Sequence, residues 1–340
     1  MAKMKVFVTG HRGYIGAHLV DVLKQAGHQV TGCDLDLYAG CEWEPVTRPD
    51  RELIRDVRTL TARELEGHDC VMHLAAISND PMGELDQELT MSTNRDGSLH
   101  VAKLAKEGGV GRFLFAGSCS VYGKSARAAM TESDPLAPLS TYARSKIEAE
   151  SRLAKLAGDG FVPVLLRSAT AYGHSPMLRI DLVANNLLAC AYAVGSIRIM
   201  SDGSPWRPLV HCRDIARALL ALAEAPGEVV SGRAVNVGGN DENYRVREIA
   251  DAVQQLVPKA AIVYTGEVGA DPRSYRVSFD LLGQVVPEFK LEYTLAAGLE
   301  QLHGKLRRHR FSLADWEGDR FVRMRTLRDR LERLTTPAVA

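Results

Sequence analysis

Tyr142 and Lys146 stand four residues apart in the segment Tyr-Ala-Arg-Ser-Lys, and side chains of these two types can transfer protons. Residues four apart lie on one face of a helix, so the phenol and the ammonium group can meet the same ligand. The lysine charge favours the phenolate, which lowers the expected pKa of Tyr142. We therefore predict a helix over 142–157 that carries Tyr142 as a general base near neutral pH.

Three glycines, Gly10, Gly13 and Gly16, lie between a short apolar run and an amphipathic segment. In this arrangement the first glycine permits a tight turn, the second lets the backbone approach a pyrophosphate, and the third lets the helix pack closely on the strand. Amides at the helix N-terminus then point towards the anion. The predicted cofactor contacts of this loop are Gly10, Arg12, Gly13, Tyr14, Ile15 and Gly16.

Asp34 ends the next apolar run, about twenty residues further along the chain, as the glycine pattern requires. A carboxylate at this position accepts hydrogen bonds from an adenosine ribose and repels a 2′-phosphate. Asp34 therefore predicts NAD rather than NADP as the cofactor.

The elements that must position these residues alternate between strands and helices. Apolar runs predict strands at 5–9, 29–34, 71–75, 112–116 and 162–166, and helical periodicity appears after Gly16, over about 84–107 and over 142–157. This alternation predicts βαβ units and hence the α/β class, with a Rossmann-type, doubly wound parallel sheet. Ser118 then lies just past a strand, at the carboxyl edge where such sheets bind ligands.

The rhythm changes after about residue 170, which predicts a smaller C-terminal α/β domain for the substrate. Helices are expected at 182–194, 214–225 and 246–257, and short strands at 197–200 and 234–237. We assign 1–170 to the cofactor domain, with returns at about 207–240, and 171–206 and 241–310 to the substrate domain. Residues 311–340 alternate Arg, Asp, Glu and Leu, which is typical of a solvated amphipathic helix.

Composition narrows the kind of protein. The chain has 340 residues, of which 42 are Lys or Arg and 42 are Asp or Glu, so a nucleic acid or an anionic membrane is not the expected partner. No apolar run is long enough for a signal-peptide core or a membrane span. The six cysteines form no CxxC pair and no zinc spacing, so we expect reduced thiols, a cytoplasmic protein and no metal site.

The spacing TGxxGxxG, followed by Ser118 and Tyr-x-x-x-Lys, resembles the extended short-chain dehydrogenase/reductases, in the branch that modifies nucleotide sugars. The resemblance covers roughly residues 5–290. It implies that Ser118, Tyr142 and Lys146 are catalytic and that Tyr142 and Lys146 also bind NAD. It further implies cofactor contacts at Asp56, Val57, Leu74, Ala75, Ala76 and Asn94, although for Asn94 a structural link between helix and backbone is the favoured interpretation.

The two residues after Ser118 bear on the reaction type. In the 4,6-dehydratases of this branch an Asp-Glu pair follows the catalytic hydroxyl residue, whereas this chain has Cys119 and Ser120. The groups needed to eliminate water are therefore missing. A catalytic cysteine of the 3,5-epimerase type would fall at 120, so we interpret Cys119 as a buried thiol, with a substrate-facing weak acid as the alternative.

The resemblance also implies substrate contacts, and this chain departs from the family pattern at several of them. Thr170 replaces a common Asn, and Pro208 replaces an Asp beside Arg207, which would pair with the diphosphate. Arg179 and Asp181 could reach the sugar. The full set of predicted substrate contacts is Ser78, Ser118, Cys119, Ser120, Thr170, Asn185, Arg207 and Arg273.

Together these residues predict an NAD-dependent epimerase of a nucleotide-diphosphate sugar, acting at C4 through a 4-keto intermediate. A net ketoreductase or dehydrogenase would use the same residues and is the main alternative. A 4,6-dehydratase and a non-catalytic NAD-binding sensor are further alternatives, and an intact Ser-Tyr-Lys set argues against the sensor. The resemblance also implies a homodimer through the helices at 84–107 and 142–157.

Overall fold

The computed structural model describes residues 3–266 and 271–330. Seven parallel strands form the main sheet, in the order β10-β6-β5-β4-β1-β2-β3. The chain order reverses between β1 and β4, which is the switch point at which doubly wound sheets bind ligands. The bounds of the strands are β1 Lys5–Thr9, β2 Gln29–Asp34, β3 Arg51–Ile54, β4 Cys70–His73, β5 Arg112–Ser118, β6 Val162–Ser168 and β10 Ala234–Val237.

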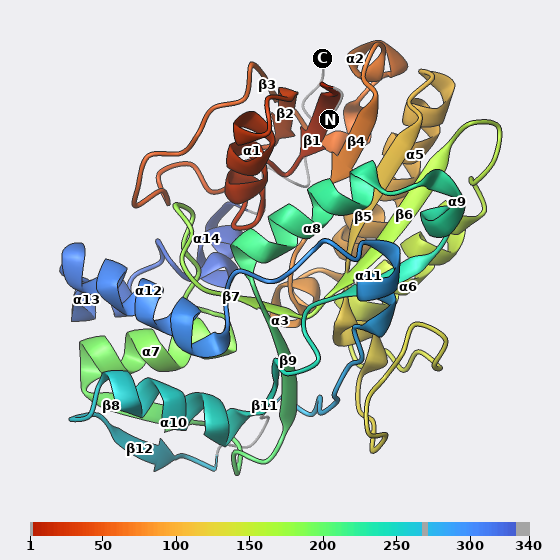
Figure 1. The fold of residues 1–340 in the computed structure, drawn as a ribbon. Coiled ribbons are helices and arrows are strands. Elements are labelled where there is room, and N and C mark those ends of the chain that lie inside the picture. Colours follow the sequence, from red (N-terminus) through yellow and green to blue (C-terminus); the bar gives the residue numbers. More distant parts are fainter. Residues whose placement is uncertain (1–2, 267–270, 331–340) are drawn as a thin grey trace.

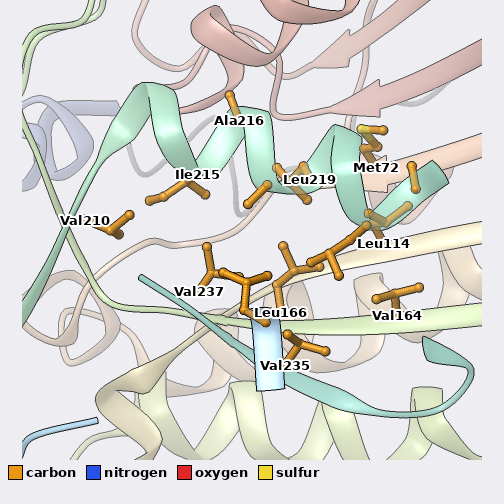
Figure 2. Packing of buried hydrophobic residues seen from close by; sticks show 14 of the residues in the cluster. Met72, Leu114, Val164, Leu166, Val210, Ile215, Ala216, Leu219, Val235 and Val237 are labelled. Carbon is orange, nitrogen blue, oxygen red and sulfur yellow. The ribbon is translucent and has the colours of Figure 1, made fainter. Parts of the chain in front are cut away.

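The sheet is apolar on both faces because helices cover both. On one face, β-strand side chains such as Leu114 and Leu166 pack against Ile215 and Leu219 of α8 (Figure 2). On the other face, Phe113 and its neighbours pack against α5 and α6. The helices that flank the sheet are α1 Gly16–Gln25, α5 Ser98–Glu107, α6 Thr141–Ala154 and α8 Cys212–Glu224. The predicted Rossmann-type sheet is therefore confirmed.

The predicted helix at 84–107 is divided into three consecutive segments. A short helix, α4 Gln87–Met91, leads into a π-helical stretch, Ser92–Gly97, which continues as α5. Such π-helical turns within α-helices are frequently found at functional sites. The short elements beside the main sheet are the 3₁₀ turns Val57–Thr59 and Cys119–Tyr122 and the helices α2 Ala62–Leu65, α3 Asp80–Gly83 and α9 Gly227–Val230.

A second, smaller part packs around α7, which lies at the lower left of Figure 1 with α10 and α12. Its strands form a three-stranded sheet, β11-β9-β7, and a parallel pair, β12-β8. The sequence did not predict β3, β7, β9, β11 or β12. The bounds are β7 Thr170–Tyr172, α7 Val183–Val194, β8 Ser196–Ile199, β9 Trp206–His211, β11 Asn243–Arg245, α10 Val246–Leu256, β12 Ala261–Tyr264, α11 Asp280–Val285 and α12 Leu295–Arg308.

The chain returns to the main sheet more often than the predicted domain boundaries allow. As expected within 207–240, α8 and β10 belong to the first part, but β9 pairs with β7 and β11 instead of joining the main sheet. A second return follows in the range 241–310, which the sequence assigned wholly to the substrate domain. There Val277, Phe279 and Leu282 lie in the hydrophobic core of the main sheet.

The segment after residue 310 differs from the predicted solvated amphipathic helix. It forms two short helices, α13 Leu313–Glu317 and α14 Arg323–Arg330. Phe321, Arg323 and Leu327 are buried, so this segment is packed against the rest of the protein. The alternating charges indicated solvent exposure, but an arginine can be buried when its aliphatic part packs against apolar groups and its guanidinium finds polar partners. Residues 331–340 lie outside the described residues.

Three further features of the described residues concern the cysteines, membrane-spanning helices and metal-ligating groups. The six cysteines are all free and buried. Within 3–266 and 271–330, no helix combines the length and apolarity that a membrane crossing requires, and no group of three or more metal-ligating side chains forms a metal site.

Candidate active site

A cavity of about 840 Å³ lies between the two parts, over the carboxyl ends of the main strands. It is large enough for a dinucleotide-sized ligand, because ordinary ligand pockets measure roughly 300–1,000 Å³. Most of the predicted site residues line it: Gly10, Gly13, Tyr14, Ile15, Gly16, Asp34, Asp56, Val57, Leu74, Ala75, Ala76, Ser78, Ser118, Ser120, Tyr142, Lys146, Thr170, Arg207 and Arg273.

The glycine loop leaves space where a diphosphate would bind. Gly10 has a positive φ of 73°, and a Cβ there would lie 2.7 Å from the Ala75 backbone nitrogen. A Cβ on Gly16 would lie 2.1 Å from the Gly10 carbonyl oxygen. On Gly13, by contrast, a Cβ would meet only that same oxygen, at 3.1 Å, and the residue borders the cavity. Helix α1 begins here without a side-chain cap, so no side chain competes with an anion at its N-terminus, although the Ala17 amide already donates to the Gly13 carbonyl at 3.0 Å.

The adenosine end of the cavity is bordered by two carboxylates. Asp34 accepts hydrogen bonds from the backbone amides of Arg12, at 3.0 Å, and Asp36, at 2.8 Å. Burial raises the pKa of Asp34, while these amides stabilise its charged form. Asp56 is paired with Arg58 at 2.6 Å. The buried Thr93 hydroxyl also lines the cavity and has no hydrogen-bond partner among the described residues. The sequence gave no reason to expect Thr93 at the cavity wall.

The predicted catalytic residues come from two elements that meet at the cavity. Ser118 ends β5, and Tyr142 and Lys146 lie on α6, which Ser140 caps through the Ala143 amide. The Lys146 ammonium donates to the Ala116 carbonyl at 2.8 Å and lies 5.8 Å from the centroid of the Tyr142 ring. Glu84 of the segment after α3 accepts the Thr141 amide at 2.7 Å, which fixes the start of α6.

The prediction that Lys146 lowers the pKa of Tyr142 is wrong for this structure. Burial raises the pKa of Tyr142 to about 12, and the nearby Asp80 carboxylate adds to the rise, while Ser118, Arg179 and Arg273 act against it. Burial also lowers the pKa of Lys146 to about 7. A pKa of about 7 leaves Lys146 only partly protonated at neutral pH, and desolvation of the Tyr142 phenol outweighs the attraction that the spacing suggested.

Cys119 and Ser120 have different surroundings although they are adjacent. The Cys119 side chain is fully buried, donates to the Arg167 carbonyl at 3.1 Å and does not border the cavity. Burial raises the pKa of its thiol, so it is an unreactive core residue, in agreement with the favoured interpretation. The Ser120 hydroxyl does border the cavity and finds no hydrogen-bond partner in the described part of the chain, so it is free for a ligand.

At the opposite end from the glycine loop, four charged side chains alternate in sign along the cavity wall. Asp80 pairs with Arg273 at 2.5 Å, Arg273 with Asp271 at 2.5 Å, and Asp271 with Arg207 at 2.9 Å. Although burial alone would raise it, the two guanidinium groups hold the pKa of Asp271 at about 2. Both predicted phosphate-binding arginines are therefore already paired with a carboxylate.

Three further predicted residues lie outside the cavity wall. The side chain of Arg12 pairs with Glu52 at 2.7 Å and with Asp36 at 2.5 Å. Only the backbone of Arg12 therefore contributes to the glycine loop. The Asn94 side chain bonds the Ile77 amide at 2.8 Å and the Ser145 hydroxyl at 3.1 Å, which is the structural link that was expected. Both side chains are fully engaged in holding the protein together.

Asn185 is the third of these residues and is buried on α7. Its amide accepts from the Gly173 amide at 2.7 Å and donates to the Tyr14 hydroxyl at 3.1 Å and the Arg179 carbonyl at 2.8 Å. The next residue, Asn186, borders the cavity instead. The substrate-facing asparagine was therefore predicted one position too early.

Several residues of the cavity wall carried little or no signal in the sequence. Arg179 pairs with Asp181 at 2.9 Å and donates to the Ser78 hydroxyl at 3.2 Å, which places this pair between the two ends of the cavity. Tyr38, Arg323 and Leu327 also line it. Tyr38 follows Asp34 by four residues, and that proximity is the one feature of the sequence that could have indicated it.

The sheet topology, the glycine loop at the switch point and a Ser-Tyr-Lys set beside it define a nucleotide-dependent oxidoreductase-type enzyme site. A family model described as the NAD dependent epimerase/dehydratase family matches residues 6–238, and the chain belongs to this family. The predicted resemblance is thus confirmed, and so is NAD as the cofactor, which the glycine loop and Asp34 fit.

The relatives share the fold but differ in the reactions that their names state. The chain is 27% identical over 284 residues to an uncharacterized UDP-glucose epimerase, YtcB, of Bacillus subtilis, covering 79% of this chain and 87% of that protein. It is 26% identical to UDP-glucuronic acid decarboxylase 1 of Danio rerio, covering 81% of this chain but only 66% of the relative. The solved structure of MoeE5 in complex with UDP-glucose and NAD is 27% identical, with a TM-score of 0.75, covering 89% and 99% of the two chains.

Proposed function

We propose that this protein epimerises a nucleotide-diphosphate sugar at C4, using NAD, through a transient 4-keto sugar. The observation that carries the proposal is the complete set Ser118, Tyr142 and Lys146 at the cavity, followed in the sequence by no carboxylate that could eliminate water. Cys119, at the position of the dehydratase aspartate, is buried away from the cavity. The set supports oxidation and reduction at one carbon and lacks the acid–base pair for dehydration.

Tyr142 accepts the proton of the C4 hydroxyl in this proposal, with Ser118 relaying it. Because the pKa of Tyr142 is raised to about 12, its phenol is protonated in the resting protein, and it must release that proton to bulk water before it can accept one from the sugar. NAD held by the glycine loop and Asp34 would supply the hydride acceptor and donor for C4, and its positive charge would favour the phenolate form of Tyr142. Lys146, anchored to the Ala116 carbonyl, positions the phenol. After the keto sugar turns over in the cavity, Tyr142 returns the proton, so no net redox change results.

The substrate end supports a nucleotide diphosphate as the group that is held. Arg207 and Arg273 offer planar donors for two phosphates, a role for which guanidinium is well suited. Asp271 occupies those donors in this structure, so substrate binding requires that the diphosphate replace it. Ser78, Ser120 and Thr170 line the cavity nearer to the catalytic residues and are proposed to meet the sugar.

The test is incubation of the purified holoprotein with UDP-, dTDP-, GDP- and CDP-sugars, followed by NMR and mass analysis of the products. We expect a product of unchanged mass with inverted configuration at C4 and no net absorbance change at 340 nm. A stoichiometric 340 nm change would instead establish the ketoreductase or dehydrogenase, and loss of one water would establish a dehydratase. Tyr142→Phe is the control, because turnover that persists in this variant would remove the proposed base.

We also propose a homodimer that is held by a four-helix bundle. Each copy would contribute α6 and the continuous helical stretch that runs from α4 through α5. Light scattering on the purified protein tests it, with an expected mass of two chains. A monomer at micromolar concentration would contradict it.

A further inference from the structure

The segment that leads into α14 contacts the smaller part, where the Phe321 carbonyl accepts from the Ile180 amide at 2.9 Å, and α14 itself packs on loops of the main-sheet part and lines the cavity. Leu327 is buried in a cluster with Ile77 and Met82, and Arg330 donates to the carbonyls of Leu37, at 2.6 Å, and Ala39, at 3.1 Å. Figure 1 shows α14 between the part that holds α1 and the part that holds α7 and α12. These contacts fix α14 as one wall of the cavity that receives NAD and the substrate.

Arg323, the first residue of α14, is buried at this wall and borders the cavity. Its guanidinium donates to the carbonyls of Met177, at 3.0 Å, and Arg320, at 3.2 Å, and lies 4.6 Å above the centroid of the Tyr38 ring. Over residues 3–266 and 271–330, no carboxylate forms an ion pair with it. Arg179, another buried arginine of the cavity, differs in this respect, because Asp181 neutralises it at 2.9 Å.

A buried charge with no carboxylate in ion-pair contact is costly. Burial lowers the pKa of Arg323 and the Arg179 charge lowers it further, while the Asp181 carboxylate acts against this from beyond ion-pair distance. Carbonyl oxygens and an aromatic face orient a guanidinium but do not cancel its charge. The side chain therefore has both the position and the unmet charge to receive an anion from the cavity.

The neighbours of Arg323 identify which anion that is. Met177, whose carbonyl accepts from Arg323, packs in one cluster with Ala17 and Cys41, and Tyr38 packs against the same cluster. Ala17 belongs to the first turn of α1, directly after Gly16 of the glycine loop, at a helix start that no side chain caps. Arg323 thus lies on the glycine-loop side of the cavity, away from Arg207 and Arg273. The anion expected at the N-terminus of α1 is the diphosphate of NAD.

We propose that Arg323 binds the diphosphate of NAD and that α14 closes over the bound cofactor and retains it. The glycine loop would hold the diphosphate through backbone amides, and Arg323 would supply the full positive charge that those amides lack. This assignment depends on NAD binding alone and is independent of the reaction that the sugar undergoes.

The experiment compares Arg323→Gln with Arg328→Gln, which removes an exposed arginine from the same helix. Each protein is freed of nucleotide and titrated with NAD by calorimetry and with adenosine by NMR. Adenosine fills the same subsite without a diphosphate. For Arg323→Gln we expect NAD affinity to fall by about 10- to 100-fold, NAD to dissociate correspondingly faster, and adenosine affinity to stay unchanged. Arg328→Gln is expected to bind both ligands as the parent protein does.

Three results would overturn the proposal. NAD affinity within about twofold of the parent protein would show that Arg323 does not contact the cofactor, including the case in which only the substrate KM rises. An equal loss of adenosine and NAD affinity would show a structural role. If Arg323→Gln does not fold, Arg323→Lys takes its place in the experiment. NAD affinity that falls by about 3- to 10-fold, with adenosine affinity unchanged, supports the proposal. NAD affinity equal to that of the parent protein contradicts it. Because these are binding measurements, they stand even if C4 epimerase activity is not found.

Discussion

The two ends of the cavity are built to hold anions in different ways. At the cofactor end, glycines and the uncapped start of α1 present backbone amides, and Gly10 and Gly16 have no room for a side chain. At the substrate end, Arg207 and Arg273 present full charges that Asp271 already neutralises. The first end is preorganised by the fold, whereas the second must exchange one carboxylate partner for another anion.

This difference suggests different consequences for affinity. Backbone amides need no rearrangement when a ligand arrives, so binding at the cofactor end carries little cost of reorganisation. At the substrate end the incoming diphosphate must first displace Asp271, which reduces its net affinity. The same contrast would favour tight retention of the cofactor and ready exchange of the substrate, which suits the proposed epimerase, whose cofactor would end each cycle unchanged.

The largest expected effect lies at the junction of the two ends. Tyr142→Phe removes the proposed acid–base group and should lower kcat by about 10²- to 10⁴-fold, while the affinities for NAD and for the nucleotide sugar stay close to those of the parent protein. Single-turnover kinetics and calorimetry measure the two quantities. If either affinity falls together with kcat, the two ends do not bind independently of the catalytic group.

A methyl group at Gly16 should disrupt the preorganised end. In Gly16→Ala the new Cβ would fall 2.1 Å from the Gly10 carbonyl oxygen, so we expect a loss of about 2–4 kcal/mol in unfolding free energy together with loss of NAD binding. Gly304→Ala on α12 is the matched control, since a Cβ there meets no atom within 4 Å. It should raise stability by about 0.5–1 kcal/mol. Equal effects of the two substitutions in urea denaturation would refute the steric argument.

Lys146 provides a test based on pH. Burial lowers its pKa in the folded protein from 10.5 to about 7, so between these values the unfolded chain binds more protons and stability rises with pH. In nucleotide-free protein, the stability of the parent relative to Lys146→Met should therefore increase by about 2–4 kcal/mol from pH 7 to pH 10. Lys155→Met, at an exposed lysine just after α6, is the control. A constant difference across this range would mean that Lys146 is not desolvated.

The smallest effects are expected at the substrate end, and they have opposite signs. Arg207→Met should weaken nucleotide-sugar binding by about 10- to 100-fold, because it removes a charged donor. Asp271→Asn should instead tighten it by about 3- to 10-fold, because it frees Arg207 from its carboxylate and leaves Arg273 paired with Asp80 alone. Competition binding with the matching nucleoside diphosphate measures both. Weaker binding in Asp271→Asn would mean that this carboxylate orients the arginines for the ligand.

Local motifs were predictable from the sequence because neighbouring residues define them. Gly10, Gly13 and Gly16 act through the turn that they themselves form, and Tyr142 and Lys146 share a face because any helix places them so. The same reasoning failed for the pKa of Tyr142, since burial is contributed by segments far away in the chain. It also failed to choose between Asn185 and Asn186, where a helical rotation of about 100° separates a core residue from a cavity residue.

Arg323 and Asp271 illustrate what lay beyond sequence reasoning. Alternating charges after residue 310 indicate a solvated helix, and only the docking of Leu327 between distant loops turns Arg323 inward. Likewise, Asp271 becomes important through its pairing with Arg207, 64 positions earlier in the chain. Such residues can be identified only once the fold has brought the segments together.

The Asn185 side chain has a consequence for protein engineering. It joins α7 of the smaller part to Tyr14 of the glycine loop and to Gly173 between them. A chimera that exchanges the substrate part between family members at residue 170 would keep the Asn185 bonds to Gly173 and Arg179, but it would pair Asn185 of one protein with residue 14 of another. Exchangeable modules in this protein are therefore not contiguous, and a transplanted substrate part should carry residue 14 along with it.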